Sequence, residues 1–221
     1  MTYRRRSFFT LIELLISMAL MSLVLSALTY FYYQINQLNR ESEKIEAKAF
    51  RLRYLENRLM SVLPRTIAPN DKQKDFYFFS GTSSDTFNKV GNPYLVFTFD
   101  NSVNLVDPQY SNHVIGRIFL DNENNLSLAV SPTSKRWQED RLIPLKREIL
   151  LDNVSDLRFS FFTVNNMNFP SGSWVAEWKQ SNEQLPALLK IEITEGIGHD
   201  KEKKVFVFPL PNSNENIIYS Q

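Results

Sequence analysis

The sequence contains no cysteine and carries almost no net charge. Without cysteine there are no disulfides, thiolate metal ligands or cysteine nucleophiles, so a folded domain must be held together by its apolar core. Lysine and arginine number 25 against 24 aspartate and glutamate, which gives a formal net charge of +1. A balance this close to zero provides no overall basic field for nucleic acid. The length of 221 residues suits one globular domain with an attached segment.

Signatures of catalysis and of metal binding are also missing. There is no G-x-S-x-G, no P-loop, and no G-x-G-x-x-G after a predicted strand. The two histidines, His113 and His199, have no second ligand at helical or hairpin spacing apart from the aspartate that follows His199. Residues 121–132 begin like a calcium loop, but Leu126 replaces the glycine at position 6 and Pro132 replaces the glutamate at position 12. We therefore predict a non-enzymatic protein with no metal and no cofactor.

A long apolar run near the N-terminus is the main feature that is present. Across residues 8–33 the only formal charge is Glu13, and crossing a bilayer takes roughly 20 residues. A cleaved secretory signal has an apolar region of only about 7–15 residues that ends in small side chains. This run ends in the aromatic cluster TYFYY, which suits a membrane–water interface. The sequence thus predicts a transmembrane helix over residues 9–33, with the preceding arginines (Arg4, Arg5 and Arg6) on the cytoplasmic side.

The helical pattern continues beyond the apolar run. Residues 34–63 contain no Gly or Pro, and apolar residues recur there at seven-residue spacing: Leu38, Ile45, Leu52 and Leu59. This pattern predicts a one-sided amphipathic helix over residues 34–64 that ends at Pro64. We expect it to lie on the domain's own sheet. A coiled coil is the weaker alternative, because polar residues interrupt the second apolar column: Glu41, Ser42, Lys48 and Glu56.

The motif FTLIELLISMAL, residues 9–20, resembles the N-terminal segment of type IV pilins and of type II secretion pseudopilins. The resemblance implies that a prepilin peptidase removes a basic leader, residues 1–8, and that the new N-terminal residue Phe9 is methylated. Glu13 is then the fifth mature residue, as in that family. One position departs from the pattern, because glycine normally precedes the cut and this chain has Phe8 there. A cut after Ser7 would make Phe8 the first residue and would move Glu13 to the sixth position.

Glu13 needs an explanation, because a carboxylate in hydrocarbon costs about 2.5–3.5 kcal/mol on insertion scales. In the resembling family the fifth-position glutamate is thought to pair with the N-terminal amine of a neighbouring subunit in the filament. A paired charge in a medium of low dielectric is far less costly than an isolated one. The alternative is a glutamate near the cytoplasmic end of the span that reaches back to the lipid headgroups.

The rest of the chain, residues 65–221, is rich in short alternating segments separated by turn residues. We predict strands over residues 75–81, 93–100, 114–121, 125–131, 141–152, 157–164, 188–195 and 204–211. The expected fold is α+β, with the long N-terminal transmembrane helix packed on a mainly antiparallel β-sheet of pilin-like type. The phenylalanines of the strands are expected to be mostly core, with some aromatic surface left for a partner: Phe76, Phe78, Phe79, Phe159, Phe161 and Phe162.

Trp174 and Trp178 lie four residues apart on either side of Glu177. Tryptophan is enriched at interface hot spots, so the pair is a candidate partner-contact patch. The alternative is that both indoles pack onto the sheet.

Several stretches narrow the resemblance to the J-type minor pseudopilin of type II secretion. They are YLENRLMSVLPR (residues 54–65), LLDNVSDLRFSFF (150–162), SWVAEW (173–178), LPALLKIEIT (185–194) and VFVFPLP (205–211), whereas residues 65–149 match no family pattern. The subtype implies a subunit at the tip of a pseudopilus that helps to start assembly and to export folded proteins.

The implied partners are minor and major pseudopilins, the prepilin peptidase and the inner-membrane assembly platform, which is driven by a cytoplasmic ATPase. The implied location is the bacterial inner membrane, crossed once, with a periplasmic C-terminal domain.

Two other classes remain open. A minor pilin of a type IV or DNA-uptake pilus would need an exposed basic or aromatic stripe for single-stranded DNA. A membrane-anchored enzyme would need a cleft with converging polar groups.

Overall fold

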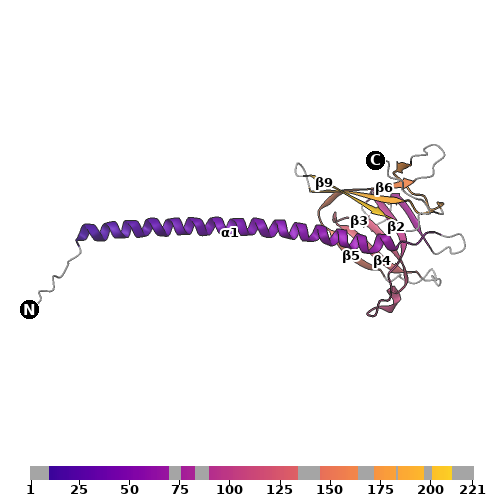
Figure 1. Ribbon diagram of the computed structural model, residues 1–221, viewed down its shortest axis with the longest axis horizontal. Coiled ribbons are helices and arrows are strands. Elements are labelled where there is room, and N and C mark those ends of the chain that lie inside the picture. The colour runs from indigo at the N-terminus through magenta and orange to yellow at the C-terminus, as the bar shows by residue number, and fades with distance from the viewer. Residues whose placement is uncertain are drawn as a thin grey trace, which may run out of the picture. The chain divides into compact units, whose positions relative to one another are not determined.

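The fold was analysed in a computed structural model (Figure 1), which describes residues 10–69, 76–82, 90–133, 145–163, 172–182, 184–196 and 201–210. The chain divides into two compact units, Met1–Phe50 and Arg51–Gln221. One helix, α1 (Leu11–Val62), contributes to both units. The predicted leader, residues 1–8, and Phe9 lie outside the described residues.

The helix forms as the sequence predicts and ends where proline requires it to end. No Gly or Pro occurs in its 52 residues. Pro64 has no amide hydrogen for a helical hydrogen bond and disfavours helical geometry at the residue before it. The α-helix accordingly stops at Val62, and a single 3₁₀ turn, η1 (Leu63–Arg65), follows.

The second unit contains a five-stranded antiparallel sheet in which neighbours in sequence are neighbours in space. Its strands are β1 (Phe78–Thr82), β2 (Pro93–Asp100), β3 (His113–Leu120), β4 (Leu126–Pro132) and β5 (Lys146–Leu151). Another 3₁₀ turn, η2 (Pro108–Tyr110), lies in the connection between β2 and β3. All five strands were predicted, although residues 141–144 of the last predicted segment lie outside the described residues.

A four-stranded antiparallel sheet completes the unit, in the order β7-β6-β8-β9. Its strands are β6 (Val154–Thr163), β7 (Ser173–Val175), β8 (Leu188–Glu195) and β9 (Glu202–Pro209). The sequence predicted all of these except β7. That strand has only three residues and pairs at the edge with the end of β6, where Phe162 lies opposite Trp174. Such a short segment carries too little alternation to be read as a strand.

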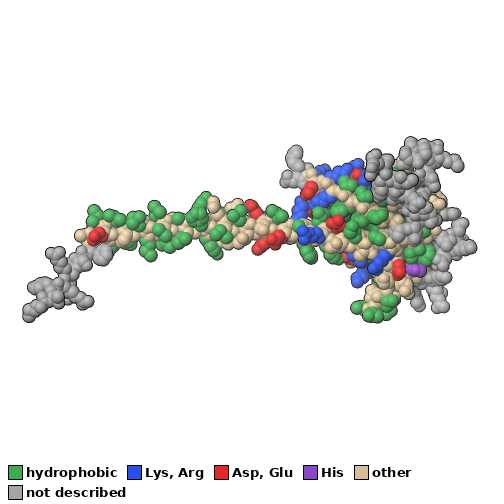
Figure 2. Space-filling model, in the orientation of Figure 1, with side chains coloured by type: hydrophobic (Ala, Val, Ile, Leu, Met, Phe, Trp, Pro, Cys, Tyr) green, Lys and Arg blue, Asp and Glu red, His purple; other side chains and the backbone are tan. Residues whose placement is uncertain are grey.

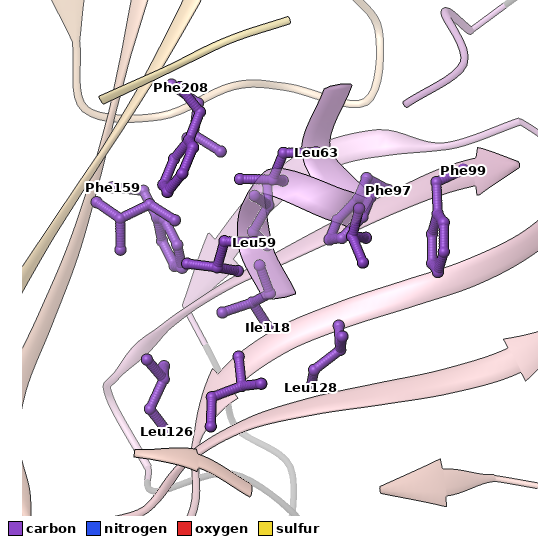
Figure 3. Close-up of a cluster of buried hydrophobic side chains, with 14 of the residues drawn as sticks. Leu59, Leu63, Phe97, Phe99, Ile118, Leu126, Leu128, Phe159 and Phe208 are labelled. Carbon is purple, nitrogen blue, oxygen red and sulfur yellow. The ribbon is translucent and has the colours of Figure 1, made fainter. Parts of the chain in front are cut away.

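The inner faces of both sheets and the end of α1 form one hydrophobic core. Figure 3 shows Leu59 and Leu63 between Phe159 and Phe208 of the four-stranded sheet and Phe97 of the five-stranded sheet. Leu59 and Leu63 are fully buried. Because the helix supplies the side chains between the two sheets, the β domain needs the last turns of α1 for its own core.

The seven-residue apolar stripe is buried only at its C-terminal end. Leu59 is fully buried and Leu52 is partly buried, whereas Leu38 and Ile45 are 64% and 69% exposed. The prediction that residues 34–64 lie on the sheet is confirmed for the last three turns, which belong to the same unit as the sheets, and it stays a prediction for residues 34–50. Leu38 and Ile45 belong to the first unit, whereas Leu52 and Leu59 belong to the second.

Polar contacts also join the end of the helix to β5 and to the residue that follows it. Arg58 Nε donates to both carboxylate oxygens of Glu148 at 3.1 and 3.0 Å, and the Tyr54 hydroxyl donates to the same carboxylate. The hydrogen bond to Glu148 raises the pKa of Tyr54 above its ordinary value. Arg51 forms an ion pair with Asp152 just beyond the strand.

Candidate functional site

The N-terminal end of α1 holds the predicted assembly residue, Glu13, in a capping box. The backbone N–H of Thr10 donates to Glu13 Oε2 at 2.9 Å, and the Thr10 hydroxyl donates to the same oxygen at 3.0 Å. In return the backbone N–H of Glu13 lies 3.4 Å from Thr10 Oγ1. Thr10 is thus the N-cap and Glu13 the third helical residue, so the carboxylate satisfies a backbone donor of its own chain. Its negative charge also lies at the favourable end of the helix dipole.

Thr10 is a helix-capping residue that sequence reasoning missed. The T-x-x-E spacing of a capping box is visible in the sequence near the start of the apolar run. In the single chain Glu13 acts as part of the helix cap, and its role in assembly remains a prediction. Phe8 and Phe9, the predicted processing residues, lie outside the described residues, so cleavage and methylation there remain predictions.

The apolar half of α1 suits a hydrocarbon environment both in its composition and in the way its few hydroxyl groups are hydrogen-bonded. Among the described residues, one helix is long and apolar enough to cross a membrane, with a mean hydropathy of 2.3 in its most apolar window. Four hydroxyl groups within the apolar stretch donate to backbone carbonyls three or four residues earlier: Ser17, Ser22, Ser26 and Thr29. Because hydrocarbon offers no hydrogen-bond partners, this internal pairing removes the cost of burying those hydroxyls.

The two candidate partner-contact tryptophans occupy different environments. Trp178 is only 6% exposed and packs against Phe78 of β1 and Phe161 of β6. Its backbone N–H donates to Ser80 Oγ at 2.8 Å, and its indole N–H donates to the Gln184 carbonyl at 3.2 Å. Trp178 therefore joins the two sheets in the core, as the packing alternative expected.

Trp174 lies on the outer face of the four-stranded sheet and is 42% exposed. Its ring lies 5.3 Å from that of Phe162, and Lys190 Nζ is 4.8 Å from its centroid. An exposed indole backed by a ring and a cation is available to a partner. The partner contact predicted for this patch therefore remains a prediction for Trp174, and the geometry gives Trp178 a structural role.

The calcium-like stretch that begins at Asp121 is a turn closed by an arginine. Asp121 Oδ1 accepts hydrogen bonds from the backbone N–H groups of Glu123 and Asn125 at 2.7 and 2.8 Å. Its other oxygen accepts from the Asn125 amide and forms an ion pair with Arg147. The guanidinium therefore occupies the position beside the carboxylate where a cation would be needed, in agreement with the failed spacing.

Metal-ligating side chains do not cluster in the part of the chain that the structure describes. No group of three or more His, Asp or Glu residues within it could hold a metal ion. His113 is exposed and lies against the Phe76 ring at 5.1 Å, while His199 is outside the described residues. In the domain, the pKa of Glu192 is lowered mainly by its hydrogen bond to Lys203, and burial raises the pKa of Tyr110. A hydrogen bond to a lysine thus accounts for the first shift, and burial accounts for the second.

Comparison with known proteins points to a family for most of the chain and to no individual site. The family model described as type II secretion system (T2SS), protein J, matches residues 27–205. The match extends from within the apolar segment to the middle of β9 and includes residues 65–149, where the sequence alone suggested no family. A comparison with curated proteins found no match.

Proposed function

The chain belongs to the type II secretion system protein J family, and from this membership we propose that it acts at the tip of a pseudopilus. It is a minor pseudopilin by family, and one apolar helix makes it a single-pass protein of the inner membrane. The finer role is that it helps to start assembly of the pseudopilus and so supports the export of folded proteins. The observation that carries this proposal is the family match over residues 27–205, joined to a helix that provides both a membrane segment and part of the domain core.

The family is structural rather than catalytic, and the surfaces found here suit that role. An exposed aromatic patch at Trp174 and exposed apolar side chains such as Leu38 and Ile45 are surfaces for other proteins. The proposed partners are other minor and major pseudopilins and the inner-membrane assembly platform. The family match favours secretion over the alternative of a type IV or DNA-uptake pilus.

We further propose that the N-terminus is cytoplasmic and the β domain periplasmic. The support is the three-arginine cluster that precedes the apolar run, because short basic flanks stay on the cytoplasmic side. An alkaline phosphatase fused after Gln221 should be active, since it needs the periplasm to fold. Activity from a cytoplasmic reporter at the same position, together with a silent phosphatase fusion, would reverse the orientation.

The secretory role is tested by deleting the gene and restoring it on a plasmid. Deletion should leave folded proteins of the secretion system in the periplasm, and the restored gene should return them to the medium. Loss of DNA uptake or of surface pili with normal secretion would instead support the pilus alternative. Crosslinking of the restored protein to other minor pseudopilins would test its place in a tip complex.

A further inference from the structure

The connection between β2 and β3, residues 101–112, carries three highly exposed aliphatic side chains close together in the sequence. Val103, Leu105 and Val106 are 72%, 89% and 95% exposed. Figure 1 shows this connection projecting from the sheets, and Figure 2 shows hydrophobic atoms at its projecting end. Single exposed apolar residues are normal on a protein surface, but three together at the end of one projection mark an interaction site.

The base of this loop is firmly closed. The backbone N–H of Asn101 donates to the Asn112 carbonyl, and the N–H of Asn112 donates to the Ser102 carbonyl, both at 2.8 Å. The Asn101 side chain donates to the Tyr110 carbonyl at 2.8 Å, and the Tyr110 ring is buried. Arg65 at the end of η1 donates to Ser102 Oγ at 3.1 Å. The base is therefore anchored in the domain beside the end of the helix.

The tip has a framework of its own, centred on Asn104. Its side-chain oxygen accepts hydrogen bonds from the backbone N–H groups of Val106 and Asp107 at 3.1 and 3.0 Å. Its own backbone N–H donates to Ser111 Oγ at 2.9 Å. These bonds hold the chain in a turn that directs valine and leucine side chains outward. Exposed apolar side chains do not stabilise the fold, so their place at the tip of an ordered loop favours a role in binding.

The charges around the tip indicate what it binds. Residues 101–112 contain no lysine or arginine, and Asp107 and the preceding Asp100 carry carboxylates. The exposed tip also has no Trp or Tyr, the side chains that anchor loops at lipid headgroups, because Tyr110 is buried. A negatively charged lipid surface would repel such a tip. A protein pocket with an apolar floor and basic residues at its rim would complement both its apolar and its acidic groups.

We propose that the β2–β3 loop inserts Val103, Leu105 and Val106 into an apolar pocket, bordered by lysine or arginine, on another protein of the same secretion apparatus. This inference rests on the proposed function only in naming the apparatus. The loop then acts as a specific contact outside the helix, which would let the β domain recognise one partner surface. The contact with the basic residues is assigned to Asp107, whose carboxylate accepts a hydrogen bond from the Gln109 side chain at 3.1 Å.

The test places a photo-crosslinking amino acid at position 105 of the full chain, in cells that make the whole apparatus. We expect one adduct with a different protein, and its crosslinked peptide should be apolar with a lysine or arginine nearby. The same crosslinker at Glu123 is the matched control, because it lies in the turn at the opposite end of β3 and is exposed. It should not form that adduct.

Substitutions separate the apolar contact from the charge. Val103→Ser combined with Val106→Ser should reduce the adduct several-fold, and Asp107→Asn, which keeps the shape of the side chain, should reduce it less. The two serine substitutions lie at exposed positions, and the asparagine substitution preserves the shape of the side chain. The thermal unfolding temperature of the domain should therefore not change. Val106→Asn alone, at a residue that is 95% exposed, repeats the test if the double variant fails to fold.

Other occupants give distinct results. Because the native chain has no cysteine, Leu105→Cys carries a single environment-sensitive fluorophore in the full chain reconstituted into phosphatidylethanolamine–phosphatidylglycerol vesicles. We expect the emission of a fluorophore exposed to water. Blue-shifted emission that is quenched by lipid-borne quenchers would overturn the proposal in favour of insertion into the bilayer. An adduct with a second copy of this chain, or one unchanged by the serine substitutions, would overturn it as well.

The same strains distinguish failure of this inference from failure of the proposed function. Secretion that depends on the gene but is unaffected by the serine variants, with no adduct at position 105, would overturn the loop contact alone. Secretion that does not depend on the gene would overturn the proposed function. A secretion defect in the serine variants together with the expected adduct supports both.

Discussion

Arg58 on the penultimate turn of α1 forms a two-point contact with Glu148 of β5, with Nε 3.1 and 3.0 Å from the two carboxylate oxygens. The two side chains are 29% and 21% exposed, so the pair is partly shielded from water. Tyr54, one turn earlier, donates to the same carboxylate. The helix is thereby fixed across the strand at the sheet edge by one acceptor that serves two donors. If the Glu148 carboxylate is removed, both the Arg58 guanidinium and the Tyr54 hydroxyl lose this hydrogen-bond acceptor.

The first prediction concerns this contact. Glu148→Leu should lower the free energy of unfolding of the domain by about 1–3 kcal/mol, because a partly buried guanidinium and a phenol lose their acceptor. The double variant Arg58→Met, Glu148→Leu should recover part of that loss, since an apolar pair leaves no unpaired charge. Chemical denaturation of the full chain in detergent, followed by tryptophan fluorescence, measures both. Lys146→Ala, at an exposed position two residues earlier in β5, is the control.

The second prediction compares two positions of the same seven-residue stripe. Leu59→Ala should destabilise the domain by about 2–5 kcal/mol, because it removes a fully buried side chain from the core between the sheets. Ile45→Ala, at a residue that is 69% exposed, should change stability by less than about 0.5 kcal/mol. Ile45→Ala should instead weaken crosslinking to other pseudopilins. Equal destabilisation by the two variants would mean that the stripe is buried along its whole length.

The third prediction is a pH dependence caused by Glu192. Its hydrogen bonds to Lys203 at 2.8 Å and, secondarily, to Lys190 at 3.3 Å lower its pKa below the ordinary value of 4.5. A lowered carboxyl pKa contributes stability above the pKa of the unfolded chain, and this stability is lost as the pH falls through the folded value. Glu192→Gln should therefore be less stable than the native chain at neutral pH, and the difference should shrink below pH 4.5.

Urea midpoints measured across that range check the dependence on Glu192. Glu177→Gln, at an exposed position, is the control for the loss of one carboxylate. A difference between the native chain and Glu192→Gln that stays constant with pH would contradict this assignment.

The fourth prediction separates the two roles open to Glu13. Glu13→Gln keeps an oxygen that can accept from the Thr10 N–H but removes the charge, whereas Glu13→Leu removes both. If pairing with a neighbour's N-terminal amine drives assembly, both variants should insert into the membrane and lose crosslinks to partner pseudopilins, and Glu13→Asp should be intermediate because its reach is shorter. Thr10→Val removes the cap hydroxyl and keeps the charge, so it should retain most crosslinking. Normal assembly of Glu13→Gln would identify the cap, and not the charge, as the requirement.

The fifth prediction is proteolytic processing. Co-expression with a prepilin peptidase should yield a mature chain that begins at Phe9 with a methylated amine, and Phe8 is the second choice. The basis is the basic leader followed by FTLIE. Mass spectrometry of the N-terminal peptide reads the cut and the methyl group directly. An intact N-terminus in the presence of active peptidase would show that Phe8 in place of glycine blocks the cut.

The sequence by itself determined the elements that depend on local pattern. A run without Gly or Pro specifies the helix, Pro64 specifies its end, and alternation specifies eight of the nine strands. The helix N-terminal motif and the late strands were sufficient to indicate the family that the comparison then identified. These features can be predicted from the sequence because helices, turns and strands depend on the pattern of residues a few positions apart.

Only the tertiary structure decided which apolar residues are covered. Leu59 and Ile45 occupy equivalent positions in one repeat, yet the core surrounds the first and leaves the second exposed. Trp174 and Trp178 are four residues apart, yet one lies on an outer face and the other joins two sheets. Periodicity fixes the face on which a side chain lies, but burial depends on whether a distant strand reaches that face. That contact is made by residues far apart in the chain, so no local pattern encodes it.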